Sequence, residues 1–459
     1  MRYIRNLYNK FSFSNLSPQS LVTLSFISVI LIGTFLLSRP FASTGPALNF
    51  VDSLFTSTSA TCVTGLIVVD TGSCFSMAGQ IIILILIQAG GLGIMSFSTL
   101  LLFFFHGRFG IGSREVIQET LAFFDTIDIG SLLKSVFIFT FAFEAIGAVL
   151  LTIRFLFDMP FDKALFTAAF HSVSAFCNAG FSTFPDSLTA YRSDIFVNSI
   201  IMFLIISGGI GFIVIYELYK NRKKGLSFHK LSLHSRAVLL FSGLLIIIGT
   251  VFLFIFEYNV SMKGYSLLAK ILSSMFQSVS ARTAGFNTID ISTVSMSSLL
   301  VIANLMFIGA SPASCGGGIK TATLAVIFAF IRSKINDTKN VNLFYSTLPF
   351  KVISKAIVLV VFAILTVILF SFLITIAEFH NTPFSDNGTQ FIQIFFEVVS
   401  AFGTVGLSAG ITAALSPASR ILLTIVMLIG RVGPLTLAVV IATHDENDIQ
   451  YAEDNILVG

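Results

Sequence analysis

Long apolar segments recur along this chain, and shorter polar connections separate them. A helix needs about 20 predominantly apolar residues to cross the hydrocarbon core of a membrane. Eight segments approach or exceed this length with few charges. We therefore predict spanning helices in pairs, with first members at about 19–38, 134–157, 236–257 and 353–378 and second members at about 77–105, 195–219, 296–331 and 418–443.

A six-residue phrase, Phe-x-x-x-Ser-Ala, lies between the two members of each pair. The segment that carries the phrase has roughly 10 to 15 residues, which is too short to cross a membrane. We therefore expect a short re-entrant helix in each pair. The four copies of the phrase are Phe55–Ala60, Phe170–Ala175, Phe276–Ala281 and Phe396–Ala401.

Each copy is followed by a glycine and a bulky apolar residue. The glycines, Gly65, Gly180, Gly285 and Gly406, follow one another at intervals of 115, 105 and 121 residues. Four matches in register indicate a fourfold pseudo-repeat. The predicted fold is an all-α integral membrane protein in which four pseudo-repeated helix–pore-loop–helix units surround one central pore. The predicted repeats are 1–110, 111–225, 226–340 and 341–459, the last with a cytoplasmic C-terminus.

The four re-entrant loops place non-helical backbone at membrane depth, where each unsatisfied polar group costs several kcal/mol. We therefore expect the loops to line a shared cavity. The short helices then point their partially negative C-terminal ends at its axis, which favours a cation there. The alternative is that glycines merely allow close helix packing, but this accounts for one loop and not for four in register.

The four loops, aligned on their glycines, form the predicted selectivity filter. Glycine adopts positive φ without steric cost, which lets backbone carbonyls face a common axis. Rings of carbonyls replace the hydration shell of K⁺, and the fourth loop is similar to the potassium-channel filter sequence. The predicted K⁺ site is formed by the carbonyls of Cys62, Val63, Thr64, Gly65, Cys177, Asn178, Ala179, Gly180, Arg282, Thr283, Ala284, Gly285, Gly403, Thr404, Val405 and Gly406.

A second glycine cluster begins 24 to 28 residues after each filter glycine, at Gly90, Gly208, Gly309 and Gly430. We interpret these small residues as leaving room around the axis. In the third repeat, proline and three consecutive glycines interrupt the span, because they cannot continue a stable helix. We predict an intramembrane gating loop at 309–321, with a passive helix kink as the alternative. Its residues are Gly309, Ala310, Ser311, Pro312, Ala313, Ser314, Cys315, Gly316, Gly317, Gly318, Ile319, Lys320 and Thr321.

Three basic residues lie in or beside these motifs. A charge at membrane depth is expensive, so Arg431 is predicted to face the pore as a cation barrier that cooperates with the loop. A structural ion pair is the alternative for Arg431. For Arg282, a supporting contact with Glu397 competes with direct contact with ions. Lys320 ends the loop, and its side chain is expected to extend to the cytoplasmic face.

Composition supports a membrane protein, since 55% of the residues are hydrophobic, 11% are charged and the mean hydropathy is +0.92. Most of the 27 Lys and Arg fall in the N-terminal head and in alternate connections, which predicts cytoplasmic N- and C-termini. The basic cluster at 220–224 is interpreted as a topology signal and not as a nucleic-acid site. The four cysteines lack metal-ligand spacing. We predict no covalent cofactor and no nucleic-acid partner.

The loops at 59–66 and 400–407 resemble those of the Trk/Ktr/HKT superfamily of potassium uptake proteins. The first repeat begins without an additional leading helix pair, so the chain is more similar to the KtrB type than to the TrkH type. Glycine at all four filter positions implies potassium selectivity in that family. The resemblance also implies a homodimer in a bacterial inner membrane, docked on a cytoplasmic nucleotide-binding ring similar to KtrA. It makes Na⁺ an expected activator.

Two other functions are compatible with a membrane chain of this kind. An ion-coupled secondary carrier with alternating access needs carboxylates at mid-membrane and usually inverted repeats; Glu144 is the one acidic candidate, and these repeats run in parallel. A membrane-embedded enzyme needs a nucleophile with a base, or a metal cluster. His171 beside Ser172 is interpreted as a satisfied polar contact, so we do not predict an enzyme.

Overall fold

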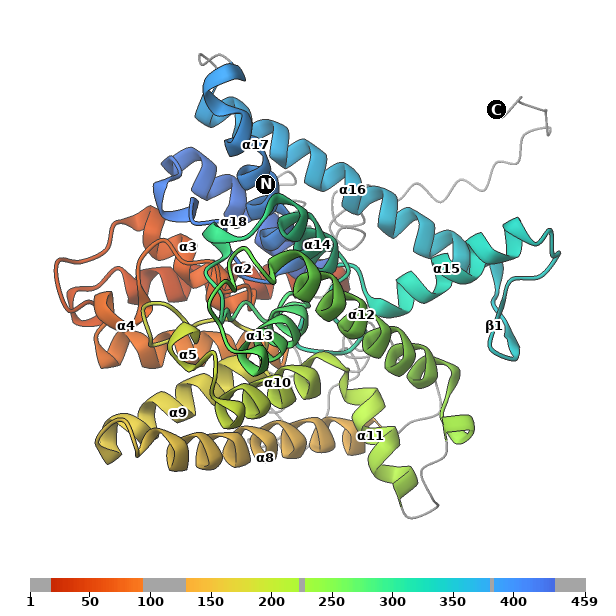
Figure 1. Cartoon of the computed structure of the whole chain (residues 1–459), viewed down its shortest axis with the longest axis horizontal. Helices are drawn as coiled ribbons and strands as arrows, with labels where there is room; N and C mark the ends of the chain where they lie inside the picture. Colours follow the sequence, from red (N-terminus) through yellow and green to blue (C-terminus); the bar gives the residue numbers. More distant parts are fainter. Residues whose placement is uncertain (1–17, 94–128, 223–227, 380–383, 434–459) are drawn as a thin grey trace, which may run out of the picture.

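The computed structural model describes residues 18–93, 129–222, 228–379 and 384–433. Helices dominate these residues. We use the word quarter for the part of the chain that each predicted repeat covers (1–110, 111–225, 226–340 and 341–459), and the four quarters follow one another around the centre of the view in Figure 1. The expectation of a predominantly helical chain is confirmed, although the described residues also contain one short β-hairpin. The predicted positions of the two termini, and the predicted span ends at 105 and 443, lie outside the described residues.

Four long helices begin the four quarters, close to the predicted first spans. Each is long and apolar enough to cross a membrane. Apolar side chains such as Ile32 and Phe35 are exposed on them, as expected for surfaces that face lipid. These helices are α2 (Pro18–Leu37), α8 (Ile129–Phe155), α12 (Leu233–Glu257) and α16 (Phe350–Phe379).

A shorter helix follows each long one and carries the Phe-x-x-x-Ser-Ala phrase. The phenylalanine and alanine of all four phrases are buried. Two of these helices have the predicted length, whereas α9 has 16 residues and α17 has 20, so the predicted upper limit of 15 was wrong for them. The short helices are α3 (Phe50–Thr61), α9 (Phe161–Phe176), α13 (Leu267–Ser280) and α17 (Phe384–Gly403).

The apolar helix that comes after the short helix and its loop begins in the same way in each quarter, and we call it the second helix of the quarter. A side-chain oxygen at the N-cap accepts a hydrogen bond from a backbone N–H of the first turn, which satisfies one of the helix's free donors. The caps are Ser76, Asp194, Ser295 and Ser416. The helices are α5 (Met77–Gly91), α10 (Ile195–Gly209), α14 (Met296–Phe307) and α18 (Pro417–Val432).

Two of the predicted second spans are broken into two helices. The predicted continuous span 195–219 was wrong, because α10 and α11 (Phe212–Asn221) meet at an angle of 98°. Gly211 has φ of +99°, a left-handed conformation that ends the first helix at no steric cost for glycine. In the third quarter, residues 308–320 separate α14 from α15 (Thr321–Ile335), as the proline and glycines predicted. We call these residues the connecting loop 308–320.

Short elements complete the described fold. An antiparallel hairpin pairs β1 with β2 in the register Asn342 to Thr347 and Leu343 to Ser346. The remaining elements are η2 (Pro40–Ala42), α4 (Thr71–Cys74), η3 (Thr189–Tyr191), η5 (Phe228–Lys230), η6 (Ile291–Thr293), β1 (Asn342–Leu343), β2 (Ser346–Thr347) and η7 (Thr412–Ala414).

The quarters pack in cyclic order. The second helix of each quarter contacts the short helix of the next, so that α5 packs on α9, α10 on α13 and α14 on α17. The circle closes because α18 packs on α3 of the first quarter. An ion pair between Arg420 of α18 and Asp52 of α3 lies in this closing contact. The loops that follow the short helices are therefore brought towards one centre.

Candidate functional site

The four predicted filter loops share one backbone conformation. Their first residue lies at or just beyond the end of a short helix, as with the C-caps Cys62 and Cys177. Their second residue and their glycine both have positive φ, and a non-glycine residue held there costs about 1–3 kcal/mol. The φ values are +57° at Val63, +59° at Asn178, +78° at Thr283 and +48° at Thr404, and +91° at Gly65, +70° at Gly180, +78° at Gly285 and +94° at Gly406.

The serine of each phrase holds its loop in this conformation. The hydroxyls of Ser59 and Ser400 accept hydrogen bonds from the backbone N–H of Gly65 and Gly406, at 3.0 and 3.1 Å. In the second and third quarters the hydroxyls of Ser174 and Ser280 donate to the carbonyl of the phenylalanine after the glycine. The phrase therefore contains serine because its side chain fixes the turn.

The backbone carbonyl of the same serine also binds the third residue of each loop. The backbone N–H of the third residue donates to the serine carbonyl. The carbonyl of the third residue lies past the end of the helix and has no partner within it. The bonds run from Thr64 to Ser59 at 2.7 Å, from Ala179 to Ser174 at 2.7 Å, from Ala284 to Ser280 at 2.9 Å and from Val405 to Ser400 at 2.9 Å.

The four glycines meet in a ring. A Cβ atom added to any one of them would collide with the carbonyl oxygen of the third loop residue in a neighbouring quarter. Only glycine fits such an approach at positive φ. The order is cyclic, with distances from the added Cβ to the oxygen of 2.4 Å for Gly65 to Ala179, 2.8 Å for Gly180 to Ala284, 2.3 Å for Gly285 to Val405 and 2.2 Å for Gly406 to Thr64.

A cavity of about 470 Å³ opens on one side of this ring, and all four glycines line it. Its wall also carries the carboxylates Asp186 and Asp290 and the guanidinium of Arg192. The ring is therefore accessible from that side to a small hydrated solute.

The connecting loop 308–320 lies against the opposite side. The backbone N–H of Gly317 donates to Thr404 Oγ1 at 3.0 Å. A Cβ added to Gly316 would lie 2.2 Å from Thr283 Oγ1. The side-chain amide of Asn178 lies 3.0 Å from the same Thr283 oxygen, and its oxygen is placed to accept that bond. Second-position side chains of the filter loops thus contact the connecting loop directly.

Backbone hydrogen bonds fasten the connecting loop to the break between α10 and α11. The N–H groups of Ser311 and Cys315 donate to the carbonyls of Gly209 and Gly208, at 3.0 and 3.2 Å. The Ala313 carbonyl accepts from Phe212 at 2.8 Å. The two irregular stretches therefore satisfy each other's polar groups, as irregular backbone in a membrane requires.

Bonds within the connecting loop stiffen it further. Ser314 Oγ donates to the Ser311 carbonyl at 2.6 Å, and Thr321 N–H donates to the Ala310 carbonyl at 3.2 Å. Lys320 Nζ donates to the Gly316 carbonyl at 2.6 Å. The expectation that the Lys320 side chain extends to the cytoplasmic face was therefore wrong. The close approaches of Pro312 to Gly211, of Gly317 to Gly309 and of Gly403 to Gly318 complete its packing.

Arg431 ties the connecting loop to the first quarter. Its Nη1 donates to the Cys315 carbonyl and its Nη2 to the Gly90 carbonyl. One guanidinium from α18 therefore binds backbone oxygens of two other quarters, and no carboxylate pairs with it among the described residues. The alternative of a structural ion pair therefore finds no carboxylate among the described residues, and the role of Arg431 as a cation barrier stays a prediction.

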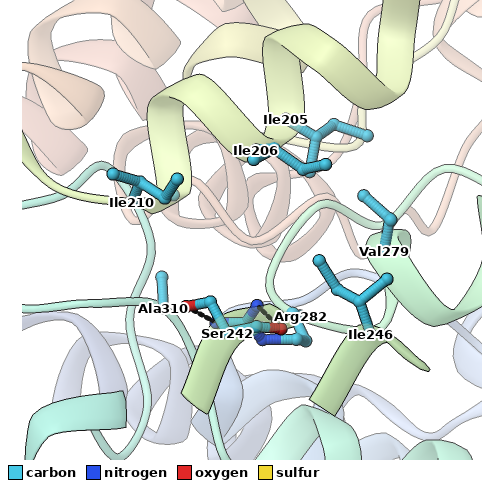
Figure 2. A pocket seen from close by; sticks show the side chains of 9 residues that line it. Ile205, Ile206, Ile210, Ser242, Ile246, Val279, Arg282 and Ala310 are labelled. Atoms are coloured by element: carbon cyan, nitrogen blue, oxygen red, sulfur yellow. Dashed lines mark hydrogen bonds between the residues drawn. The ribbon is translucent and has the colours of Figure 1, made fainter. Parts of the chain in front are cut away.

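Figure 2 shows the Arg282 side chain beside Ser242, at the edge of a small cavity. Its guanidinium donates to the carbonyl and the hydroxyl of Ser242 on α12, at 3.3 and 3.1 Å. It lines a small cavity of about 20 Å³ with apolar neighbours. The expected contact with Glu397 was wrong, because that carboxylate accepts bonds from Ser408 and Thr412 instead.

The glycines of the second clusters allow close packing between helices, and this accounts for them better than free space around the axis does. A Cβ at Gly90, Gly208 or Gly430 would lie 1.9, 1.7 or 2.0 Å from the last carbonyls of a short helix. Those carbonyls belong to Thr61, Phe176 and Phe402. The interpretation of these glycines as space around a pore was therefore incomplete. These glycines allow the second helix of a quarter to pack closely against the C-terminal end of the short helix in the same quarter.

Two buried polar residues lie behind the second quarter's loop. Glu144 on α8 accepts bonds from Gln88 Nε2 at 3.1 and 3.3 Å. His171 contacts the Thr167 carbonyl at 2.8 Å and Ser182 Oγ at 2.9 Å, so it is the satisfied polar contact that we expected. All four cysteines are free, and the described residues contain no cluster of His, Cys, Asp and Glu suited to a metal.

Comparisons with known proteins identify the family. A family model described as "TrkH: Cation transport protein" matches residues 9–450. The chain is 39% identical to Ktr system potassium uptake protein B of Vibrio alginolyticus over 96% of its length and 94% of that protein. Its identity to the protein of the same name from Bacillus subtilis is 38%, over 96% of this chain and 97% of that one.

A more distant relative and a solved structure agree. The Potassium/sodium uptake protein NtpJ of Enterococcus hirae is 33% identical over 97% of this chain and 98% of its own. The crystal structure of the potassium transporter TrkH from Vibrio parahaemolyticus superposes with a TM-score of 0.71 at 18% identity, covering 94% and 86% of the two chains, which shows a shared fold. The predicted superfamily and the expectation that the chain is not an enzyme are both confirmed. The chain belongs to the TrkH family of cation transport proteins.

Proposed function

We propose that this protein is the potassium-translocating subunit of a Ktr-type uptake system. The observation that carries the proposal is the ring of Gly65, Gly180, Gly285 and Gly406, which is open to a cavity on one side and covered by the connecting loop on the other. Relatives at 38–39% identity bear the name Ktr system potassium uptake protein B, which supports K⁺ as the transported ion.

Selection follows from the backbone around the ring. In each loop the third-residue carbonyl approaches the neighbouring glycine, so the wall of the ring is made of main-chain oxygens. Such oxygens replace the hydration shell of K⁺. The short helices end at these loops, and their partially negative C-terminal ends favour a cation at the centre. K⁺ is the transported ion in this proposal and no covalent cofactor takes part.

Gating belongs to the connecting loop and Arg431. In the state described, the loop contacts Thr283 and Thr404 below the ring, and Arg431 binds the loop through the Cys315 carbonyl. Ions that leave the ring on this side meet a covered exit with a positive charge beside it. Passage therefore requires the loop to move and the guanidinium to release its carbonyl partners.

The assembly and its setting follow from the same relatives. We place the protein in a bacterial inner membrane with both termini in the cytoplasm, as a homodimer on a nucleotide-binding regulatory ring similar to KtrA. The word "system" in the names of the relatives supports additional subunits. The name of NtpJ, a potassium/sodium uptake protein, supports a role for Na⁺ as activator.

Gly65→Ser tests selectivity directly. The full chain is reconstituted in vesicles, and ⁸⁶Rb⁺ uptake is measured with K⁺ or Na⁺ as competitor. The intact protein should be inhibited by K⁺ and not by equal Na⁺. A serine side chain at Gly65 meets the Ala179 oxygen and distorts the ring, so Na⁺ should now compete. If Na⁺ competes equally well with the intact protein and the variant, the ring does not select the ion.

The alternative function is an ion-coupled secondary carrier with alternating access. The buried carboxylate of Glu144 favours it, because ionisable residues inside membranes often mark ion paths. Its oxygens bond to Gln88 behind the second loop, however, and the quarters repeat in parallel. A saturating, exchange-dependent rate in the same vesicles would favour the carrier, whereas a large ohmic current favours the pore.

A further inference from the structure

A cavity of about 390 Å³ lies at the end of α15, away from the glycine ring. Helix α12, helix α15 and the β1–β2 hairpin enclose it. Its volume falls in the range of about 300–1,000 Å³ that is common for small-molecule sites. The transport pathway uses none of its residues, so the cavity calls for its own explanation.

The polarity of the side chains that line this cavity increases along one face of α15. Phe328, Arg332 and Asn336 follow one another at intervals of four residues, which places them on the same face of a helix. Towards the end of the helix, the side chains on this face are first aromatic (Phe328), then positively charged (Arg332) and finally an amide (Asn336). On α12, Leu240 and Phe241 extend the apolar part, and the rings of Phe241 and Phe328 meet edge to face at 5.8 Å.

The apolar end of the cavity is open to the surroundings. Leu240, on the candidate spanning helix α12, is 46% exposed, and Phe328, on the adjacent helix α15, is 54% exposed. We expect large apolar side chains that are exposed on a membrane-spanning helix, or on the helix beside it, to face the acyl chains of the bilayer. The hydrocarbon part of a ligand can therefore enter from the lipid side.

The polar end carries a positive charge without a counter-charge. Arg332 forms no ion pair with a carboxylate in the part of the chain that the structure describes. A planar guanidinium binds phosphate through two parallel hydrogen bonds. The neighbouring amides of Asn336 and Asn340 line the same space and supply further donors.

The hairpin forms a rim over the polar end, and its tip packs against the guanidinium of Arg236 on α12, which lies outside the cavity lining. At its tip Phe344 has φ of +54°, a conformation that a bulky residue adopts only when its contacts hold it there. Its ring lies 5.3 Å from the Arg236 guanidinium and packs edge to face on Phe228. The Nε of Arg236 is buried and has no partner among the described residues.

We propose that this cavity binds one anionic phospholipid, with the phosphate at Arg332 and Asn336 and an acyl chain along Leu240 and Phe328. The basic ends of α12 and α15 place the site at headgroup level, where pockets between spanning helices can bind anionic headgroups. A zwitterionic lipid brings a positive group next to Arg332 and binds less well. The lipid joins α12 to α15, the helix that continues from the connecting loop.

Native mass spectrometry of the full chain in a neutral detergent tests this proposal, with dioleoyl phosphatidylglycerol and dioleoyl phosphatidylcholine added in turn. Phosphatidylglycerol should be retained more strongly. Because a charge-assisted hydrogen bond is worth about 1.5–3 kcal/mol, Arg332→Gln should weaken its binding about tenfold or more. Arg332→Lys keeps the charge without the planar fork and should fall between the two.

Lys334→Gln is the matched control. Lys334 has the same charge on the same helix end, but its Nζ lies by the ring of Phe330, outside the cavity lining. This variant should change binding by no more than about twofold. Equal losses from Arg332→Gln and Lys334→Gln would show general charge attraction and overturn the site.

Two further results would also overturn the proposal. One is equal retention of phosphatidylcholine and phosphatidylglycerol. The other is displacement of phosphatidylglycerol by inorganic phosphate at millimolar concentration, which would assign the cavity to a free anion. Thermal stability of each variant, measured without added lipid, verifies that the fold is intact.

Discussion

Replacing Arg431 by glutamine is expected to accelerate K⁺ flux. In the structure the guanidinium donates to the carbonyls of Cys315 and Gly90, and thereby joins the connecting loop to the first quarter. A glutamine side chain is shorter and uncharged, so it cannot bridge both oxygens. The loop then loses its link to α18 while its own backbone bonds remain.

The size of the effect follows from these two hydrogen bonds. Bonds to a charged group contribute about 1.5–3 kcal/mol each, so the pair supplies about 3–6 kcal/mol of attraction. Desolvation of the buried guanidinium offsets part of that attraction. If a net 1.4 kcal/mol survives, the ratio of docked to undocked loop falls about tenfold, and flux through a rarely open path rises in proportion.

The assay is ⁸⁶Rb⁺ uptake into vesicles that contain equal amounts of folded protein. Arg420→Gln is the matched control, because it removes an arginine from the same helix that pairs with Asp52 far from the connecting loop. It should lower thermal stability without raising flux. An Arg431→Gln flux no faster than that of the intact protein would refute the gating role, and an equal rise in Arg420→Gln would point to general loosening.

Three further outcomes are expected. Deleting residues 313–318 should raise K⁺ flux well above that of the intact protein in the same vesicles, and a flux that does not rise contradicts the gating role of the connecting loop. Thr404→Val removes the acceptor of a loop N–H worth about 1 kcal/mol, so uptake should rise about fivefold, and an unchanged rate argues against that contact. Gly90→Ala sets a methyl group 1.9 Å from the Thr61 carbonyl and should lower stability by about 1–3 kcal/mol in thermal unfolding, whereas Gly243→Ala, which meets nothing within 4 Å, should not.

Much of the fold was predictable because the sequence repeats its local signals. Apolar length located the four long helices, and the phrase at Phe55, Phe170, Phe276 and Phe396 located the short ones. The break in the second quarter was missed although three glycines occur at 208–211. Apolar length favoured one span there, and only the fold shows that the connecting loop offers partners for a bent backbone.

The site was predictable where the cause is local and was missed where the partner is distant in sequence. Positive φ at the filter glycines follows from the residue type, and all four have it. The partner of Arg282 is Ser242, 40 residues away, and no pattern near Arg282 indicates it. A short side chain such as Ser59 also gave no signal of its role, because serine is common in packed membrane helices.

The pairing of Arg420 with Asp52 constrains how the molecule is made. These residues are 368 positions apart, so the seam between the first and last quarters forms only after nearly the whole chain has been synthesised. Until α18 forms, the Asp52 carboxylate keeps the hydrogen bond from the Asn49 amide but lacks its ion-pair partner. A product truncated before residue 420 therefore lacks the ion pair that joins the first and last quarters.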